Sequence, residues 1–387
     1  MSIDINIRDN RYNLDLNDLI VMGKRINNEK RNFLFISKVL GKHIEARPNT
    51  CKEIGAKLAG LIFDKEQKEL PYKSNERICV LGFAETATGL GMAVASYIKN
   101  CYYITTTRED ITELSSLLKF EEEHSHATTH KCFPLDKDKI VNAEKIILVD
   151  DEITTGKSMI NIIKELKSVS SVRDFIILSI LDWRSEEHRK AYDDLIKKEN
   201  INVEVLSLIC GDIKINDNST YIDNSDKLIE ETTDILNYKV LDRINLKTSY
   251  KEEEESYLLN TGRFGVEFNE IEALEKSCEE VANKLQSFIK SSEKVLILGH
   301  GENIYIPCRI ASYIKGDVFF KSTTRSPIYC ENIDDYPIKE KHVFYHKGVK
   351  YYFYNKSEIE ERYDKVILIT EDDLNVKLTN NMIIVRI

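Results

Sequence analysis

Residues 145–158, Lys-Ile-Ile-Leu-Val-Asp-Asp-Glu-Ile-Thr-Thr-Gly-Lys-Ser, join an apolar run, adjacent acids and a hydroxyl-rich turn. The run Ile146–Val149 has the composition of a strand that is buried on both faces of a parallel sheet. A helix is expected directly afterwards, over Ser158–Ser168. A buried strand that continues through a turn into a helix is the repeating unit of a doubly wound α/β fold.

The same alternation of strands and helices extends along the chain in both directions. Up to residue 215, strands are expected at Arg31–Ile36, Ile78–Gly82, Tyr102–Thr106, Phe175–Leu181 and Val203–Ile209, and helices at Thr50–Lys65, Gly91–Lys99 and Glu186–Asn200. After residue 260, strands are expected at Lys294–Gly299, Val318–Phe320, Val366–Thr370 and Met382–Val385, and a helix at Ile306–Ile314. We therefore expect a doubly wound, Rossmann-like domain over 1–215 and a second, smaller α/β domain over 261–387. The polar stretch 216–260, with its acidic run Glu252–Glu255, is expected to be a connection.

Length and charge narrow the class of protein. At about 150 residues per domain, 387 residues suggest two or three domains. The 65 acidic and 55 basic side chains give 55 − 65 = −10, which disfavours a general nucleic-acid binder. The apolar runs fall far short of the roughly 20 residues that span a bilayer, and the N-terminus lacks a basic-then-apolar signal. Eight dispersed cysteines argue against a structural zinc site and fit a reduced, cytoplasmic protein.

An internal repeat relates the two predicted α/β regions. Ala95-Ser-Tyr-Ile-Lys99 recurs as Ala311-Ser-Tyr-Ile-Lys315, and Thr106-Thr-Arg108 recurs as Thr323-Thr-Arg325. Two parallel sheets could look alike because both need apolar strands. Polar identities at a nearly constant offset favour a duplication instead. In the second copy, Thr370 stands where the first has Asp150, and the Thr-Thr-Gly turn is missing, so the second copy looks degenerate.

The turn after the apolar run carries the chemistry. Asp150 and Asp151 come at the carboxyl end of the strand, where α/β sheets bind ligands. Hydroxyls, a glycine and helix N-terminal amides then make a phosphate cradle, formed by Thr154, Thr155, Gly156, Lys157 and Ser158. Acids beside such a cradle suit sugar hydroxyls, so the ligand is expected to be a ribose 5-phosphate. A P-loop would need glycine where Asp151 stands, and a simple helix cap would not call for two adjacent acids.

This segment resembles the phosphoribosyl pyrophosphate (PRPP) motif of type I phosphoribosyltransferases. The chain is similar, more closely, to the two-domain type encoded in bacterial tellurium-resistance operons, in which a domain named after a Thr-Arg-Ser-Pro (TRSP) motif follows the transferase domain. The first domain's resemblance rests on 35–44, 83–88, 120–127 and 182–184, and the second's on 261–265 and 322–327.

The resemblance implies a fold with a hood over the sheet and a site with named roles. In this family a base nitrogen displaces pyrophosphate from C1 of PRPP, with Mg²⁺ on the pyrophosphate. Asp150 and Asp151 would hold the ribose or Mg²⁺, and the loop Glu85, Thr86, Ala87 and Thr88 would receive pyrophosphate through its backbone amides. The Glu85 carboxylate is unexpected beside an anion, so it would reach Mg²⁺ or the acceptor, or else face solvent. Arg108 is expected at the pyrophosphate, and His124 or His126, on a loop over 109–133, as an acid, a base or a pyrophosphate contact. The hood residues facing the acceptor would be Lys38, Lys42, His43 and Arg47.

The second domain is expected to supply a separate binding face, with candidate residues Arg263, His300, Glu302, Thr324, Arg325 and Ser326. The predicted activity is a transferase moving ribose 5-phosphate between PRPP and an unknown nucleobase-like acceptor, in either direction. A PRPP or nucleotide sensor without catalysis remains open, as does a ribosyl-phosphate hydrolase or phosphorylase. The resemblance further suggests a homodimer and partners encoded in the same operon.

Overall fold

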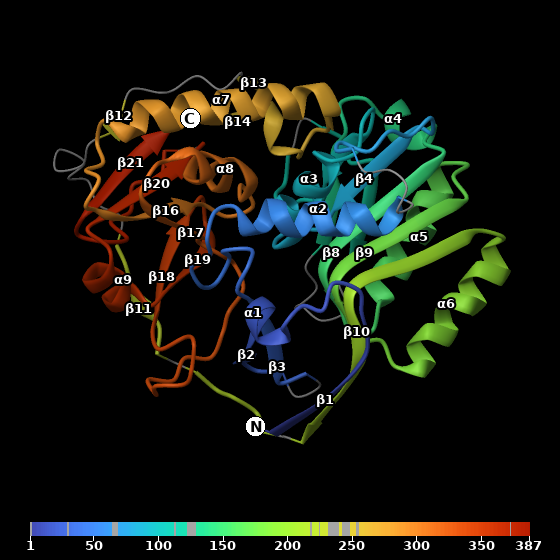
Figure 1. The fold of residues 1–387 in the computed structure, drawn as a ribbon, viewed down its shortest axis with the longest axis horizontal. Coiled ribbons are helices and arrows are strands. Elements are labelled where there is room, and N and C mark those ends of the chain that lie inside the picture. Colours follow the sequence, from blue (N-terminus) through green and yellow to red (C-terminus); the bar gives the residue numbers. More distant parts are fainter. Residues whose placement is uncertain are drawn as a thin grey trace.

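The computed structural model describes residues 2–28, 31–63, 69–111, 114–121, 129–216, 219–223, 225–230, 240–241, 248–252, 255–371 and 373–387. Two α/β units lie side by side, each built around its own sheet (Figure 1). We call residues 2–216 the first half and the described residues from 219 onward the second half. Among the described residues, none of the helices has the length and apolar character needed to cross a membrane.

The first half is built on a seven-stranded sheet in the order β1-β10-β9-β8-β4-β5-β15, whose last strand, β15 (Val266–Glu267), comes from the second half. The strands from β10 to β5 are parallel, and β1 and β15 pair antiparallel at the two edges. Its strands are β1 (Ser2–Asn10), β4 (Ile78–Gly82), β5 (Tyr102–Thr105), β8 (Lys145–Ile153), β9 (Asp174–Asp182) and β10 (Asn202–Asn216), and its helices are α1 (Leu16–Leu19), α2 (Thr50–Ile62), α3 (Ala87–Ala95), α4 (Asp138–Val141), α5 (Lys157–Val169) and α6 (Glu186–Glu199).

Two antiparallel hairpins project from this sheet. The first, which we call the hood hairpin, pairs β2 (Ile20–Lys24) with β3 (Phe33–Ser37). The second pairs β6 (Leu118–Glu121) with β7 (Thr129–Cys132). The expected doubly wound parallel sheet is therefore confirmed, and the hood appears as its own hairpin.

The second half repeats the central part of this topology. Its main sheet has the order β12-β21-β20-β16-β17. The last four of these strands, β21-β20-β16-β17, correspond in the same order to β9-β8-β4-β5 of the first sheet. The strands are β11 (Lys227–Leu228), β12 (Val240–Leu241), β13 (Thr248–Glu252), β14 (Glu255–Leu258), β15 (Val266–Glu267), β16 (Lys294–Gly299), β17 (Asp317–Ser322), β18 (Lys341–His346), β19 (Val349–Tyr354), β20 (Lys365–Thr370) and β21 (Met382–Arg386). The helices are the 3₁₀ turn Leu259–Thr261, α7 (Phe268–Gln286), α8 (Tyr305–Tyr313) and α9 (Lys356–Arg362).

The irregular bridges repeat as well. Thr107 pairs with Lys131 of β7, and Thr324 pairs with Tyr352 of β19 in the same antiparallel sense. The β18–β19 hairpin is thus the counterpart of β6–β7. Shared strand order, helices and bridges identify the second half as a structural repeat of the first.

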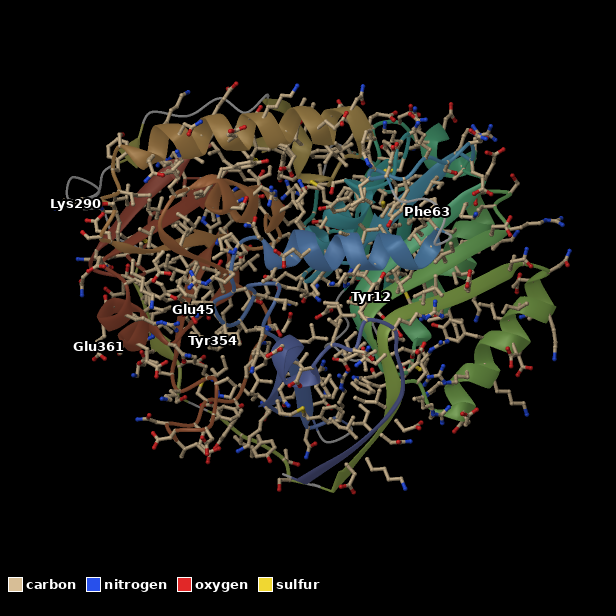
Figure 2. The ribbon with its side chains drawn as sticks, viewed as in Figure 1. Tyr12, Glu45, Phe63, Lys290, Tyr354 and Glu361 are labelled. Carbon is tan, nitrogen blue, oxygen red and sulfur yellow. The ribbon has the colours of Figure 1, made fainter. Side chains whose placement is uncertain are left out.

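The two halves share one hydrophobic core. The largest apolar cluster includes Leu90 and Val94 of α3 together with Ile306 and Ile310 of α8. A second cluster, at Tyr354 of the second half (Figure 2), packs this side chain and Ile328 against Leu34 and Ile36 of the hood hairpin. Since these clusters cross between the halves, the second half is part of one packed body with the first.

The segment Thr261–Gly265 belongs to this contact, although the sequence places it at the start of the second domain. The strand β15 that follows it pairs with β5, at the edge of the first sheet. Gly265 has φ of 94°, and a Cβ there would lie 1.6 Å from Tyr102 Oη. Glycine is therefore needed for the backbone to lie against Tyr102.

Candidate functional site

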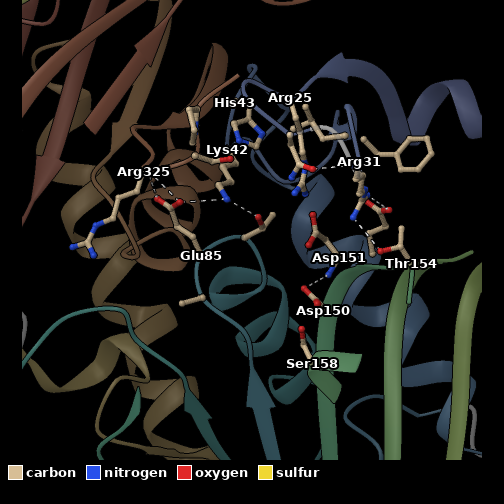
Figure 3. A pocket seen from close by; sticks show the side chains of 18 of the residues that line it. Arg25, Arg31, Lys42, His43, Glu85, Asp150, Asp151, Thr154, Ser158 and Arg325 are labelled. Atoms are coloured by element: carbon tan, nitrogen blue, oxygen red, sulfur yellow. Dashed lines mark hydrogen bonds and ion pairs between the residues drawn. The ribbon is translucent and has the colours of Figure 1, made fainter. Parts of the chain in front are cut away.

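A cavity of about 530 Å³ opens at the carboxyl end of β8, between the first sheet, the hood hairpin and the second half (Figure 3). Such a volume is typical of small-molecule sites. The first sheet and its loops contribute Ala84, Glu85, Thr86, Arg108, Asp150, Asp151, Glu152, Ile153, Thr154, Thr155, Gly156, Ser158 and Met159. The hood side contributes Arg25, Ile26, Asn28, Arg31, Leu34, Phe35, Lys42 and His43, and the second half contributes Arg325, Ser326, Pro327, Lys350 and Tyr352.

Asp150 and Asp151 lie at this cavity because β8 is the central strand between β4 and β9. Four buried residues, from Ile146 to Val149, anchor the strand, and the two half-buried acids follow at its end. The backbone N–H of Asp151 donates to Asp150 Oδ1 at 2.9 Å. The structure thus brings two hard oxygen donors to the cavity floor, in the arrangement the sequence predicts.

The cradle follows as the sequence predicts, with one exception. Thr154, Thr155, Gly156 and Ser158 line the cavity, and α5 begins at Lys157. Gly156 lies against Tyr192, whose hydroxyl donates to Gly156 O at 2.7 Å. The thirteen-residue α5 presents its N-terminal amides at this turn, which is a favourable place for a phosphate. The Lys157 side chain is exposed and is not part of the lining.

A clamp between the hood hairpin and the cradle involves Arg31 and Glu152, two residues that were not predicted as part of the site. Arg31 donates to Thr154 Oγ1 at 3.0 Å and to Glu152 Oε1 at 2.5 Å. Burial raises the pKa of Glu152, and the nearby Arg31 cation opposes that shift. Arg31 holds the hood hairpin over the cradle, a contact between residues 123 positions apart that no local pattern signals.

The loop after β4 is organised around Glu85, which is buried. Its carboxylate lies 3.3 Å from Lys42 Nζ and 3.8 Å from an Arg108 nitrogen. Thr324 Oγ1 donates to it at 2.8 Å, and the backbone N–H of Arg325 donates at 3.1 Å. Burial alone would raise the pKa of Glu85, yet Lys42, Arg108 and these donors lower it. Glu85 is therefore not a solvent-facing carboxylate, one of the alternatives that the sequence left open, but a buried residue of the cavity lining that is already paired with these groups.

The other residues of this loop differ in where they lie. Thr86 lines the cavity and accepts a hydrogen bond from Lys42 Nζ at 2.9 Å. Ala87 and Thr88 are buried in α3 and do not line the cavity. Thr88 Oγ1 donates to the Glu302 carbonyl at 2.8 Å, so it contacts the second half instead.

Arg108 lines the cavity from the end of the strand segment that follows β5. Its Nε lies 3.5 Å from His130 Nε2, and His130 Nδ1 lies 3.0 Å from Thr106 Oγ1. His130, on β7, is a buried residue that the sequence did not mark. The predicted loop histidines, His124 and His126, lie outside the described residues.

Of the expected hood residues, two reach the cavity. Lys42 and His43 line it, and burial lowers the pKa of His43 well below its usual value, with neighbouring cations adding to the effect. Lys38 is exposed and donates to Asn17 O at 2.6 Å. Arg47 is exposed, pairs with Asp317 at 2.7 Å and stacks on Phe319. Lys38 and Arg47 therefore lie outside this cavity.

Among the candidates of the second half, Arg325 and Ser326 line the cavity of the first half. The Arg325 guanidinium, however, turns away from Asp150 (Figure 3) and donates to Tyr351 Oη at 2.9 Å. Thr324 is buried on Glu85. Lys350 and Tyr352, which the sequence did not mark, also line the cavity. Arg325 and Ser326 thus lie at the cavity of the first half, together with residues of the hood and of the first sheet.

The remaining candidates gather at a second, much smaller cavity of about 20 Å³. It is lined by Glu109, Arg263, His300, Gly301, Glu302, Asn303, Tyr351, Thr370 and Glu371. Thr370 is the repeat counterpart of Asp150, so this is the degenerate copy of the main site. Arg263 is buried here and pairs with Glu371 at 2.9 Å and Glu109 at 3.5 Å. Burial would lower the pKa of Arg263, but these two carboxylates raise it well above its usual value.

A doubly wound sheet with two acids and a phosphate cradle at its carboxyl edge, under a hood, is the layout of a type I phosphoribosyltransferase. The family model described as phosphoribosyl transferase matches residues 19–212, and that of the TRSP domain C-terminal to it matches residues 260–385. The chain belongs to this phosphoribosyltransferase family, with a TRSP domain as its second half, and it is a phosphoribosyltransferase enzyme.

Solved structures similar to this chain include three adenine phosphoribosyltransferases. That of Trypanosoma brucei is 14% identical, with a TM-score of 0.29, over 42% of this chain and 65% of the other. That of Giardia lamblia is 13% identical, with a TM-score of 0.29, over 49% of this chain and 93% of the other. That of Leishmania donovani is 14% identical, with a TM-score of 0.30, over 50% and 77%. Among curated proteins, none matches the chain.

Proposed function

We propose that this enzyme uses PRPP and Mg²⁺ to transfer 5-phosphoribosyl groups to a nucleobase-like acceptor, or runs the same step in reverse. The observation that carries the proposal is the juxtaposition of Asp150, Asp151 and the 154–158 cradle on one wall of the 530 Å³ cavity. The cradle would bind the 5-phosphate, and the two carboxylates would lie beside the ribose. The acceptor would enter between the hood hairpin and the second half.

The reaction requires groups of both charges. As the C1–O bond to pyrophosphate breaks and the bond from the acceptor nitrogen forms, positive charge develops on the ribose and negative charge on the leaving group. Asp150 and Asp151 would stabilise the positive charge on the ribose. Arg108, Lys42 and the backbone of residues 84–86 would stabilise the negative charge on the leaving group. Groups that are fixed before the reaction stabilise such charges most effectively.

Mg²⁺ suits the donor set at the cavity floor. It prefers oxygen ligands and usually binds through one or two carboxylates plus substrate phosphates. Asp150 and Asp151 supply such carboxylates beside the expected ribose position. Bound there or on the pyrophosphate, the ion would supply charge neutralisation for the leaving group.

A flat heterocycle suits the acceptor side of the cavity. Phe35, Tyr352, Leu34 and Pro327 give this region aromatic and apolar surface, and Ser326 adds a hydroxyl. Such a mixture of apolar walls with a few polar groups is typical of small-molecule sites. We place the enzyme in a cytoplasmic, tellurium-resistance-associated pathway on the strength of the family resemblance in its two domains.

The test is pyrophosphate release from PRPP, measured with and without Mg²⁺ across a panel of nucleobases and other amines. The Asp150→Asn, Asp151→Asn double variant should lose turnover or PRPP binding by at least about 100-fold, because the charges beside the ribose are removed. Asp174→Asn is the matched control, since Asp174 starts the neighbouring strand β9, at the end of the strands opposite to the cavity. It should react like the wild type.

Two outcomes would overturn the proposal. One is a double variant that retains full PRPP turnover and binding while the protein is folded. The other is a wild-type enzyme that fails to bind PRPP with Mg²⁺ at millimolar concentration. Tight PRPP binding without turnover across the whole panel would favour a sensor over an enzyme that uses PRPP.

A further inference from the structure

The two halves of the chain exchange a reciprocal pair of contacts next to the cavity. In one direction, Glu85 of the first half accepts hydrogen bonds from Thr324 Oγ1 and the Arg325 N–H, at 2.8 and 3.1 Å. In the other direction, Glu302 of the second half accepts from Thr107 Oγ1 at 2.6 Å and from the Arg108 N–H at 2.8 Å. Glu302 is the repeat counterpart of Glu85, so each half's loop carboxylate holds the other half's Thr-Arg turn.

The hydrogen bonds within the two Thr-Arg turns also correspond to each other. Thr107 Oγ1 also accepts from the Glu109 N–H at 3.1 Å, and Thr324 Oγ1 accepts from the Ser326 N–H at 3.0 Å. Glu302 is buried, as is Thr107. Hydrogen bonds to a buried carboxylate are strong and directional, so they fix the turn that they reach.

The consequences for the two sites differ. The turn held by Glu302 carries Arg108, which lines the 530 Å³ cavity. The turn held by Glu85 carries Arg325, which also lines this cavity, but its guanidinium donates to Tyr351 Oη and turns away from Asp150 (Figure 3). Glu302, a residue of the second half, therefore holds the turn that carries Arg108 of the first half at the main cavity.

We infer that Glu302 is a positioning residue for the transferase site: through the Thr107–Arg108 turn, the TRSP domain sets Arg108 in place for the pyrophosphate end of PRPP. The inference rests on the proposed function for the identity of the ligand. It assigns the TRSP domain the task of completing and ordering the one working site, where the sequence suggested a separate binding face.

Three variants of the full chain test this assignment. Glu302→Ala removes both acceptors. Glu302→Gln keeps the size, with its amide oxygen able to accept from the Arg108 N–H and its NH₂ able to donate to Thr107 Oγ1. Glu275→Ala is the matched control, because Glu275 is another interfacial carboxylate of the second half that pairs with Lys52 of the first at 3.2 Å, outside the cavity lining.

The first readout is the Kd for PRPP with Mg²⁺, by calorimetry. We expect Glu302→Ala to weaken binding about tenfold or more, and Glu302→Gln to restore it to within about threefold of the wild type, since small displacements of a binding group carry costs of this order. Glu275→Ala should bind PRPP normally even though it is less stable. Normal binding by Glu302→Ala, an equal loss in Glu275→Ala, or no rescue by Gln would each overturn the inference.

The second readout separates this inference from the proposed function. Amide hydrogen exchange of a peptide covering 105–109 should accelerate in Glu302→Ala and stay unchanged in Glu275→Ala. If wild-type protein binds no PRPP, the proposed function fails, and the exchange experiment still decides whether Glu302 orders the turn. Unchanged exchange in Glu302→Ala would refute the positioning role.

Discussion

Replacement of Glu275 by Gln should remove a large and pH-dependent part of the stability of this chain. Glu275 lies on α7 and accepts from Arg309 at 2.9 Å, and from the hydroxyls of Tyr305 and Tyr313 at 2.6 Å each. Lys52 of α2 adds an ion pair from the first half. The substitution keeps the size of the side chain but removes the charge, leaving Arg309 without its carboxylate partner.

The magnitude follows from the pKa of Glu275. Burial alone would raise it, but the hydrogen bonds and charge of Arg309, with the two tyrosines, lower it from 4.5 to about 2. That difference corresponds to about 3 kcal/mol of stability at neutral pH, within the range for breaking a buried ion pair. Because the folded-state pKa is depressed, the contribution is full above the ordinary pKa and disappears as pH falls from about 4.5 towards 2.

The assay is urea unfolding of wild type and Glu275→Gln at a series of pH values from 7 down to 2.5. The difference in unfolding free energy should be about 3 kcal/mol at pH 7 and shrink steadily below pH 4.5. Glu279→Gln, an exposed position on the same helix, should stay within about 0.5 kcal/mol of the wild type throughout. A difference below about 1 kcal/mol at pH 7, or one that does not change with pH, would refute the reasoning.

Two further predictions concern stoichiometry and packing. Calorimetric titration with PRPP and Mg²⁺ should give one site per chain, because the degenerate cavity of about 20 Å³ has room for little more than a water molecule and holds the Arg263–Glu371 pair; two equivalent sites would contradict this. Gly265→Ala should lower the thermal midpoint of unfolding far more than Gly348→Ala. Both glycines have positive φ, but a Cβ at residue 265 would overlap Tyr102, whereas a Cβ at residue 348 would meet open space. Equal effects of the two substitutions would show that the close approach to Tyr102 is unimportant.

The sequence predicts the parts of the site that are local in the chain. The strand β8, the acids Asp150 and Asp151, the cradle and helix α5 follow one another within 25 residues, so apolar runs and turn chemistry are enough to place them. The site residues that come from distant segments cannot be predicted in this way. Arg31, Lys350 and Tyr352 reach the cavity, and His130 reaches Arg108, through hairpins whose positions depend on tertiary packing.

Several helices and strands also differ from their predicted positions, because packing between distant segments is not visible in the local sequence. Helix α3 begins at Ala87, four residues before the predicted start, although Gly89 and Gly91 weaken helix propensity there. Tertiary packing of α3 against α8 overrides that local preference. Helix α7 was not predicted, despite the capping box between Glu267 and Glu270. The stretch 216–260, expected as a connection, contributes the short edge strands β11 and β12 to the sheets of the second half.

The repeat gives the most informative case. Its polar identities, Glu85 with Glu302 and the two Thr-Thr-Arg runs, suggest a duplication from sequence alone. The structure shows that these same residues contact one another across the halves. A paired contact between the copies accounts for identities that strand formation does not require.

The most direct test of this account is a structure of the full chain with PRPP and Mg²⁺. We predict that the 5-phosphate binds at 154–158, the ribose beside Asp150 and Asp151, and the pyrophosphate between the 84–86 backbone and Arg108, with Glu302 still holding the Thr107–Arg108 turn. PRPP bound at the Arg263 cavity, or with its phosphate away from the cradle, would contradict the assignment of the site.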